Sequence, residues 1–234
     1  MLNMTVLLGA IPERFNSSQH DTMVDLYFAM ARGTPNQSAM KMTKWFNTNY
    51  HYIVPEFNRQ THFQITSEQL FGEIKEAQAL GISPKVVLIG PLTYLFMGKE
   101  TEVGLNRLEL LPRLLPAYHN ILSRMAASGV QWGQMYEPCL AFELEEIWLE
   151  KRSEVYTTLQ GSGPQLLLMT YFDAIDEHAS RLKALPDPSM ACILIYVAHR
   201  INSMHFLPII RSIKYFHWVS SMGAACSALI FPKH

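Results

Sequence analysis

Residues that could hold a metal ion or act as nucleophiles are sparse in this sequence. Its three cysteines, Cys139, Cys192 and Cys226, lie too far apart to form the closely spaced pairs of a zinc site. His199 and His205 have no metal-binding partner near them in the sequence. Cys139 is predicted to be a small buried apolar residue. We therefore expect neither a metal site nor a catalytic residue in this chain.

Two polar groups stand in places where a site could form. Glu137, followed by Pro138, comes directly after a predicted strand, and active sites of barrel folds gather at the carboxyl ends of strands. Asn47, Asn49, Tyr50 and His51 form a polar-aromatic cluster. This cluster could line a cleft, or it could satisfy backbone groups in an irregular segment, and the second interpretation is favoured. The large aromatic residues are expected in the core rather than as a ligand platform: Phe15, Trp45, Trp132 and Trp148.

The elements that must position these residues alternate between helices and short apolar strands. Apolar periodicity and terminal glycines predict helices over 21–32, 37–46, 67–80, 106–128, 143–160 and 173–184. Short apolar runs predict buried strands over 85–90, 130–135 and 165–170. Pro112 and Pro116 should bend the long fourth helix or split its first turns. The alternation predicts an α/β fold with a parallel sheet, and three βα units suffice only for part of a barrel.

Composition limits the class of protein further. The 234 residues are 49% hydrophobic, which is enough for a buried core, and 19 basic residues nearly balance 20 acidic ones. This balance gives no reason to expect nucleic acid or an anionic membrane as a partner. The first residues lack the basic region of a signal peptide, and no apolar run is long enough to span a membrane. With few cysteines, the expected setting is a reducing cytoplasm.

Four collinear segments carry a resemblance to a known family. They are MTKWFNTNYHYIVPEF at 42–57, VLIGPLTYLFMG at 87–98, LLPRLLPAY at 110–118 leading to QWGQMYEPCL at 131–140, and LLLMTYF at 166–172. Together they cover nearly all of residues 5–186, and the first is highly specific. On these segments the chain resembles cobalamin-independent methionine synthase, in the amino-terminal of its two barrels.

This resemblance implies both a fold and an activity. The family is similar to a pair of (β/α)8 TIM-type barrels, and it transfers methyl from 5-methyltetrahydropteroyltri-L-glutamate to homocysteine, which makes methionine. Zinc in the carboxy-terminal barrel binds the homocysteine thiolate, and zinc keeps such a sulfur deprotonated near neutral pH. By position, Lys44 matches the family lysine that contacts the folate polyglutamate tail. The alternative for Lys44 is a solvated surface lysine.

The sequence also departs from the family pattern. Where the family has QIDEPAL, Tyr136 replaces the aspartate before Glu137, and Gly133 replaces a larger apolar residue. The loss of a carboxylate and the presence of glycine in a strand are both unfavourable. We therefore interpret the two changes as relaxed constraint on the sequence, not as new chemistry. The family's basic opening segment, later strands and zinc-binding barrel are expected to lie outside this sequence.

Residues 187–234 have few acids and no clear period, and they are expected to form an irregular, aberrant tail after a barrel domain at 1–186. Reading the codons one nucleotide upstream over 214–223 permits V-L-S-L-G-V-V-D-G, a motif similar to the family's. Trp218 has one codon, so the leucine and the first glycine are forced. The same shift over 190–199 permits D-G-L-H and D-L-C-R-A, separated by one residue that cannot be the valine of the family's similar segment. We therefore predict a frameshift near Pro186–Pro188.

The sequence thus predicts a fragment of a zinc-dependent methyltransferase that is inactive alone. Its binding of polyglutamylated methyltetrahydrofolate should be weak or lost. One alternative is a module without catalysis that binds the folate tail through Lys44 or docks on an intact synthase. Another is the product of a pseudogene.

Overall fold

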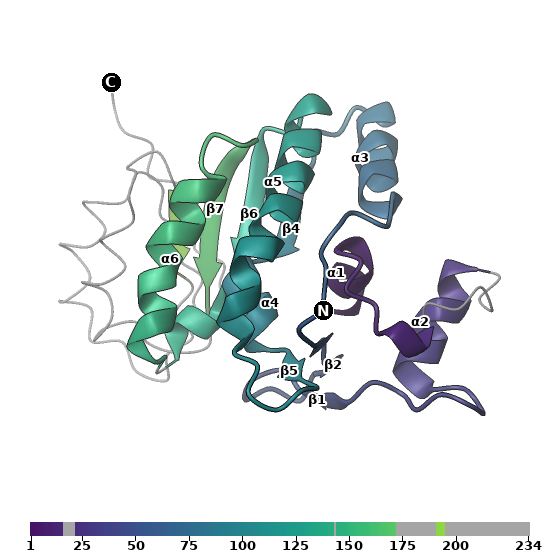
Figure 1. Ribbon diagram of the computed structural model, residues 1–234. Helices are drawn as coiled ribbons and strands as arrows, with labels where there is room; N and C mark the ends of the chain where they lie inside the picture. Colours follow the sequence, from purple (N-terminus) through teal and green to yellow (C-terminus); the bar gives the residue numbers. More distant parts are fainter. Residues whose placement is uncertain (16–21, 143, 172–190, 195–234) are drawn as a thin grey trace, which may run out of the picture. The chain divides into compact units, whose positions relative to one another are not determined.

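The computed structural model describes residues 1–15, 22–142, 144–171 and 191–194 (Figure 1). The chain divides into two compact units. The first comprises Met1–Glu73 and Tyr94–Tyr118, and the second comprises Ile74–Thr93 and His119–His234. The predicted helix over 173–184, together with His199, His205 and Cys226, lies outside the described residues.

Helices and strands are both short, and most belong to one unit only. The helices are α1 (Leu2–Leu7), η1 (Glu13–Phe15), α2 (Met23–Arg32), α3 (Gln69–Ala79), α4 (Pro91–Phe96), η2 (Arg107–Leu110), α5 (Leu111–Ala127), η3 (Pro138–Ala141) and α6 (Glu146–Leu159), where η denotes a 3-10 helix. The strands are β1 (Met42–Lys44), β2 (His51–Ile53), β3 (Glu56–Phe57), β4 (Lys85–Ile89), β5 (Lys99–Glu100), β6 (Trp132–Tyr136), β7 (Gln165–Thr170) and β8 (Ala191–Leu194).

Helix α2 of the first unit confirms the predicted helix over 21–32. The Thr22 side chain accepts from the Asp25 backbone N–H, and the Asp25 carboxylate accepts from the Thr22 N–H, which is a complete capping box. The helix ends at Gly33, whose φ of 77° lies in the left-handed region that favours glycine. Phe15 and Met30 lie in the core of this unit with Val6, Ala29 and Met40.

The predicted helix over 37–46 is wrong, because its second half forms a β-hairpin. Strands β1 and β2 are antiparallel, with Met42 opposite Ile53 and Lys44 opposite His51. The pattern over 37–46 is compatible with a helical turn, but the backbone groups of Met42–Lys44 pair with residues 51–53 further along the chain. Such cross-strand pairing cannot be recognised from the spacing of apolar residues within the segment.

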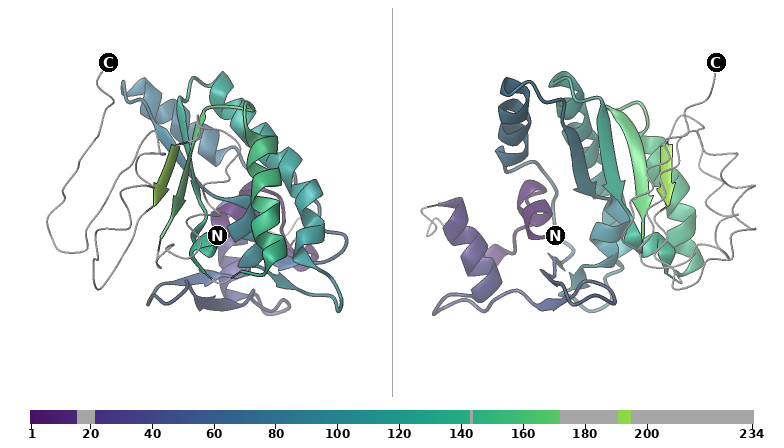
Figure 2. Two further views of the ribbon diagram at one scale, coloured as in Figure 1. Left: turned by 90° about the vertical axis from the view of Figure 1, so that its left-hand side faces the viewer. Right: turned by 180° about the vertical axis from the view of Figure 1, so that it is seen from behind.

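A four-stranded parallel sheet forms the centre of the second unit, in the order β4-β6-β7-β8. Val87 lies opposite Gln134 in β6, which in turn lies opposite Leu167 in β7. Helix α6 and the second half of α5 lie along one face of this sheet (Figure 2). The order follows the chain, so the predicted α/β class, the parallel sheet and the three predicted strands are confirmed.

The long helix predicted over 106–128 is split near its start, as its prolines indicated. The 3-10 helix η2 comes first, and α5 begins at Leu111 with Pro112 in its first turn and Pro116 inside it. Helix α3 matches the predicted helix over 67–80, and Ser67 accepts from the Gln69 N–H near its start. Leu80, expected on its apolar face, is 78% exposed because it lies past the last turn.

Strand β8 differs from the irregular tail expected over 187–234. Its backbone pairs in parallel with β7, with Ala191 opposite Leu167 and Leu194 opposite Thr170. The segment ACIL is rich in apolar residues, which suits a strand inside a parallel sheet. Within the described ranges the strands form open sheets and no closed barrel.

Candidate functional site

The β1–β2 hairpin contains Lys44, which is predicted from the sequence to contact the folate tail. The Trp45 N–H donates to the Tyr50 carbonyl at 2.7 Å, and the Val54 N–H donates to the Lys41 carbonyl at 2.8 Å. These bonds alternate along the ladder, so Lys44 and His51 form a pair that is not hydrogen-bonded through the backbone. Side chains of such pairs approach each other most closely in an antiparallel sheet.

The turn of the hairpin, from Trp45 to Tyr50, is held by one threonine. The Thr48 hydroxyl donates to the Trp45 carbonyl at 2.6 Å and accepts from the Tyr50 N–H at 3.1 Å. Phe46 has φ of 50°, the one positive value for a non-glycine residue in the described chain. Such a conformation costs about 1–2 kcal/mol for an ordinary residue, so the surrounding contacts must impose it.

Aromatic packing fixes the hairpin on the side that carries Trp45 and Tyr52. Their rings meet edge to face, with centroids 5.3 Å apart. The Tyr52 hydroxyl donates to the Met97 carbonyl at 2.8 Å, and burial raises the pKa of this phenol to about 12. Ile53, from the other side of the hairpin, packs against the core of the first unit. Lys44 and His51 are both exposed near the turn.

No ion pair engages Lys44 within the part of the chain that the structure describes. Its neighbours Asn47, Asn49 and Tyr50 are also exposed. The interpretation that the cluster at 47–51 satisfies backbone groups is wrong for these side chains, because Thr48 fulfils that role. The arrangement is an exposed cation, with an imidazole opposite it, on a hairpin whose base is held by packing.

Glu137 lies in the second unit and is fully buried. Its Oε1 accepts from the Leu92 N–H at 3.1 Å and from the Tyr156 hydroxyl at 2.8 Å, and its Oε2 accepts from the Thr93 N–H at 2.6 Å. The two N–H groups belong to the first turn of α4, where backbone donors have no partner inside the helix. Burial raises the pKa of the Glu137 carboxyl, against the opposing effect of these donors.

Packing leaves no open space at this carboxyl. A Cβ placed on Gly90 would come within 2.2 Å of the Glu137 Cδ, so only glycine fits there. The Cys139 thiol lies 3.9 Å from the Glu137 Oε2 and is also buried. Burial and the nearby carboxylate raise the pKa of the Cys139 thiol, which suits an inert residue. Glu137 thus binds the protein's own backbone and is placed to hold structure.

The two departures around Glu137 are accommodated by packing. A Cβ on Gly133 would meet Met125 at 3.3 Å and Leu166 at 3.4 Å, so neighbouring side chains already fill that space. Tyr136 is half-buried and packs its ring edge to face on Tyr171, with centroids 5.5 Å apart. Of the aromatic residues expected in the core, Phe15 and Trp148 are buried, whereas Trp45 and Trp132 are half-buried.

A polar pocket of about 650 Å³ in the first unit was not predicted from the sequence. Arg14 and Glu56 line it, and their side chains form a two-pronged ion pair with distances of 2.6 and 3.1 Å. Lys99 approaches the same Glu56 carboxylate at 3.4 Å. Glu56 lies 42 residues after Arg14, so sequence spacing gave no sign of this pairing. Glu56 thus holds two cations, Arg14 and Lys99, beside the pocket.

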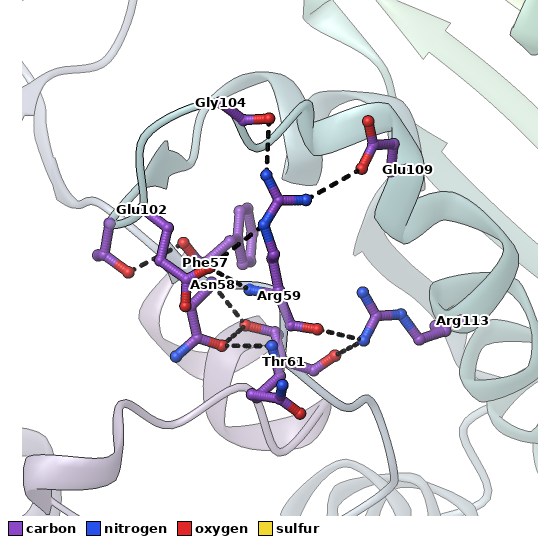
Figure 3. A network of polar contacts seen from close by, with 10 residues as sticks. Phe57, Asn58, Arg59, Thr61, Glu102, Gly104, Glu109 and Arg113 are labelled. Carbon is purple, nitrogen blue, oxygen red and sulfur yellow. Dashed lines mark hydrogen bonds and ion pairs between the residues drawn. The ribbon is translucent and has the colours of Figure 1, made fainter.

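The loop that forms one wall of this pocket is held by a network of polar contacts (Figure 3). Asn58 accepts from the Thr61 hydroxyl at 3.0 Å, and the Arg113 guanidinium donates to the carbonyls of Arg59 and Thr61. The Arg59 guanidinium in turn donates to the Gly104 carbonyl at 3.0 Å. These contacts are internal, so the cations in the network are already engaged.

Within residues 1–15, 22–142, 144–171 and 191–194, no three histidine, cysteine or acidic side chains gather closely enough to hold an ion. Over the same ranges, no helix has the length and apolar character needed to cross a bilayer.

Comparison with protein families gives a match over residues 1–209 to the family described as cobalamin-independent synthase, N-terminal domain. The match runs past residue 186, the predicted end of the barrel domain.

Individual relatives are all of one kind. The chain is 56% identical over 186 residues to a 5-methyltetrahydropteroyltriglutamate–homocysteine methyltransferase of Nitrosomonas europaea, covering 80% of this chain and 24% of the relative. Proteins with the same description from Acidithiobacillus ferrooxidans and Haemophilus influenzae are 42% identical over 231 residues and 46% identical over 186 residues. Those matches cover 87% and 80% of this chain, and 30% and 25% of the relatives. The chain therefore spans about a quarter of the length of these relatives.

Proposed function

Because the chain belongs to the cobalamin-independent methionine synthase family, in its amino-terminal domain, we propose that it contributes the grip on the folate tail in a methyl transfer that makes methionine. The substrate would be a methyltetrahydropteroyltriglutamate, as the descriptions of its relatives state for those proteins. Homocysteine would accept the methyl group. A reducing, cytoplasmic setting belongs to the same proposal and is supported by the free thiol of Cys139.

The observation that carries this proposal is the state of Lys44. Its ammonium is exposed and has no ion-pair partner within the described residues, and it stands on a hairpin held by Tyr52 and Trp45. A triglutamate tail presents several carboxylates, so it supplies the missing counter-ions. An exposed ion pair contributes about 0.2–1 kcal/mol, which corresponds to at most about a fivefold change in affinity.

We assign the methyl-transfer step to residues of another domain of the family. In this proposal zinc holds the homocysteine sulfur in the family's carboxy-terminal barrel, a different domain from the amino-terminal one that residues 1–209 match. The purified chain, supplied with homocysteine, zinc and the triglutamate substrate, should therefore form no methionine above the uncatalysed rate. Sustained turnover by the chain alone would contradict this division of labour.

A titration of the 234-residue chain tests the folate role directly. Methyltetrahydropteroyltriglutamate should bind more tightly than the monoglutamate at low salt, because its longer tail carries further carboxylates beyond those of a single glutamate. Lys44→Ala should weaken binding of the triglutamate by about two- to fivefold and leave the monoglutamate unaffected. Lys44→Arg should retain the preference, because the charge is kept.

Lys75→Ala is the matched control, since Lys75 is an exposed lysine on α3 without an ion pair in the described chain. It should leave both affinities unchanged. Equal binding of triglutamate and monoglutamate would overturn the proposal. So would a Lys44→Ala variant that binds the triglutamate as tightly as the wild-type chain does.

A further inference from the structure

A single exposed lysine gives only a small preference for an anionic tail, so a second contact is needed for a selective grip. The candidate must be exposed, able to donate to a carboxylate, and close enough to Lys44 to engage the same ligand. The register of the hairpin identifies one residue that meets these requirements. His51 lies directly opposite Lys44 and is exposed.

The geometry brings the two side chains to the same side of the hairpin. Residues opposite each other in an antiparallel pair point to one face, and their Cβ atoms lie about 4.5–5.5 Å apart. The turn contacts of Thr48 and the Tyr52 anchor maintain this register. Lys44 is the charged group that faces His51 across the ladder, and no carboxylate pairs with either residue in the described part of the chain.

We propose that Lys44 and His51 together form one two-point site for neighbouring carboxylates of a polyglutamate tail. The inference rests on the proposed function and extends it to a second residue. The lysine supplies a fixed positive charge and the imidazole an N–H donor, and a protonated imidazole adds a second charge with two donors. A γ-linked chain of glutamates repeats its carboxylates along one flexible backbone, so two of them can engage the two groups at once.

Calorimetric titrations of the full chain at low salt test the site. His51→Ala should weaken binding of the triglutamate by about two- to fivefold, because the second contact is lost. His51→Lys should retain the affinity, because it keeps a donor opposite Lys44. His119→Ala, at an exposed histidine on α5, is the control and should preserve the wild-type affinity.

The outcomes separate this inference from the function on which it rests. If Lys44→Ala loses triglutamate affinity while His51→Ala keeps the wild-type affinity, the two-point site is overturned and the folate role stands. If neither the wild-type chain nor any variant prefers the triglutamate, both are overturned. Because His51 is exposed, His51→Ala and His51→Lys should retain the thermal unfolding midpoint of the wild-type chain.

Discussion

Glu137 is a carboxyl group whose neighbours are all part of the protein itself. It holds the first turn of α4 through Leu92 and Thr93, and it accepts from Tyr156. The native state binds a proton at Glu137 more tightly than the unfolded state does, because burial raises its pKa above the ordinary 4.5. The stabilisation from this group is therefore complete below that value and is lost as the pH rises towards the raised pKa.

Glu137→Gln tests this at the level of one residue. The variant should be less stable by about 1–3 kcal/mol, because the amide NH2 cannot accept the hydrogen bonds that the second carboxyl oxygen accepts. The difference in unfolding free energy from the wild-type chain should be largest near pH 5 and should shrink towards pH 8. Urea unfolding at both pH values measures it. A difference that grows with rising pH would contradict the direction of the pKa shift.

Single residues were predictable from the sequence where their surroundings are local. Cys139 was expected to be buried, and it is. Glu137 follows a strand, where a site could form, but its carboxyl accepts hydrogen bonds from the protein itself. Its partners could not be predicted, because Leu92 and Thr93 come 45 and 44 residues earlier in the chain. The role of Thr48 was also missed, since an asparagine on either side could have made the same turn contacts.

Helix α5 contains two prolines in positions with different costs. Pro112 lies in the first turn, where its missing N–H has no intrahelical partner. Pro116 lies inside the helix, where it removes a bond to the Pro112 carbonyl and crowds it. Both side chains are exposed, so replacing either loses little packing.

Pro116→Ala should therefore raise the unfolding free energy by about 1–3 kcal/mol. Pro112→Ala is the matched control and should change it by less than about 0.5 kcal/mol. Chemical denaturation of both variants beside the wild-type chain gives the comparison. Equal effects of the two substitutions would show that position within the helix does not set the cost.

The hairpin of β1 and β2 has three residues in each strand, too few to be stable without support. Tyr52→Phe removes the bond to the Met97 carbonyl, which should cost about 0.5–1.5 kcal/mol locally. The hairpin amides of Trp45 and Val54 should then exchange with solvent about two- to tenfold faster. Tyr50→Phe is the control within the same hairpin, because the Tyr50 side chain is 77% exposed. Unchanged exchange in Tyr52→Phe would show that the ring alone anchors the hairpin.

At the scale of elements, sequence prediction succeeded where the signal is local. Helices α2 and α3 have capping residues at their starts and glycines at their ends, and strands β4, β6 and β7 are compact apolar runs. The segment at 37–46 was assigned wrongly because its structure is decided by pairing with β2. Strands β3 and β5 have two residues each, which is too short for any period to appear.

At the scale of the molecule, the alternating pattern correctly predicted an α/β fold with a parallel sheet. The order β4-β6-β7-β8 has each strand beside the next parallel strand, as repeated βα units require. The partial barrel expected from the sequence stays a prediction, because closure depends on how distant strands meet. The chain also divides into two compact units, and no shift in composition marked that division.

The gene offers a test of the predicted frameshift near Pro186–Pro188. Reading the codons of residues 187–234 one nucleotide upstream should give an open frame with G-L-H, one further residue and D-L, followed later by V-L-S-L-G-V-V-D-G. Trp218 and Met190 make the test informative, because each has a single codon. The same shift applied to residues 1–186 is the control and should give no family-like segment. A shifted frame interrupted by stop codons would contradict the prediction.

Because Cys139 is buried, its reaction with an alkylating reagent can report local opening of the second unit. Alkylating reagents need a thiolate at the surface. The Cys139 sulfur is inaccessible, and burial raises the pKa of its thiol. Its labelling, followed by mass spectrometry of the peptide that contains it, should therefore report how often the fold around Glu137 opens. The rate of that reaction would measure how often the native state opens locally, without any engineered probe.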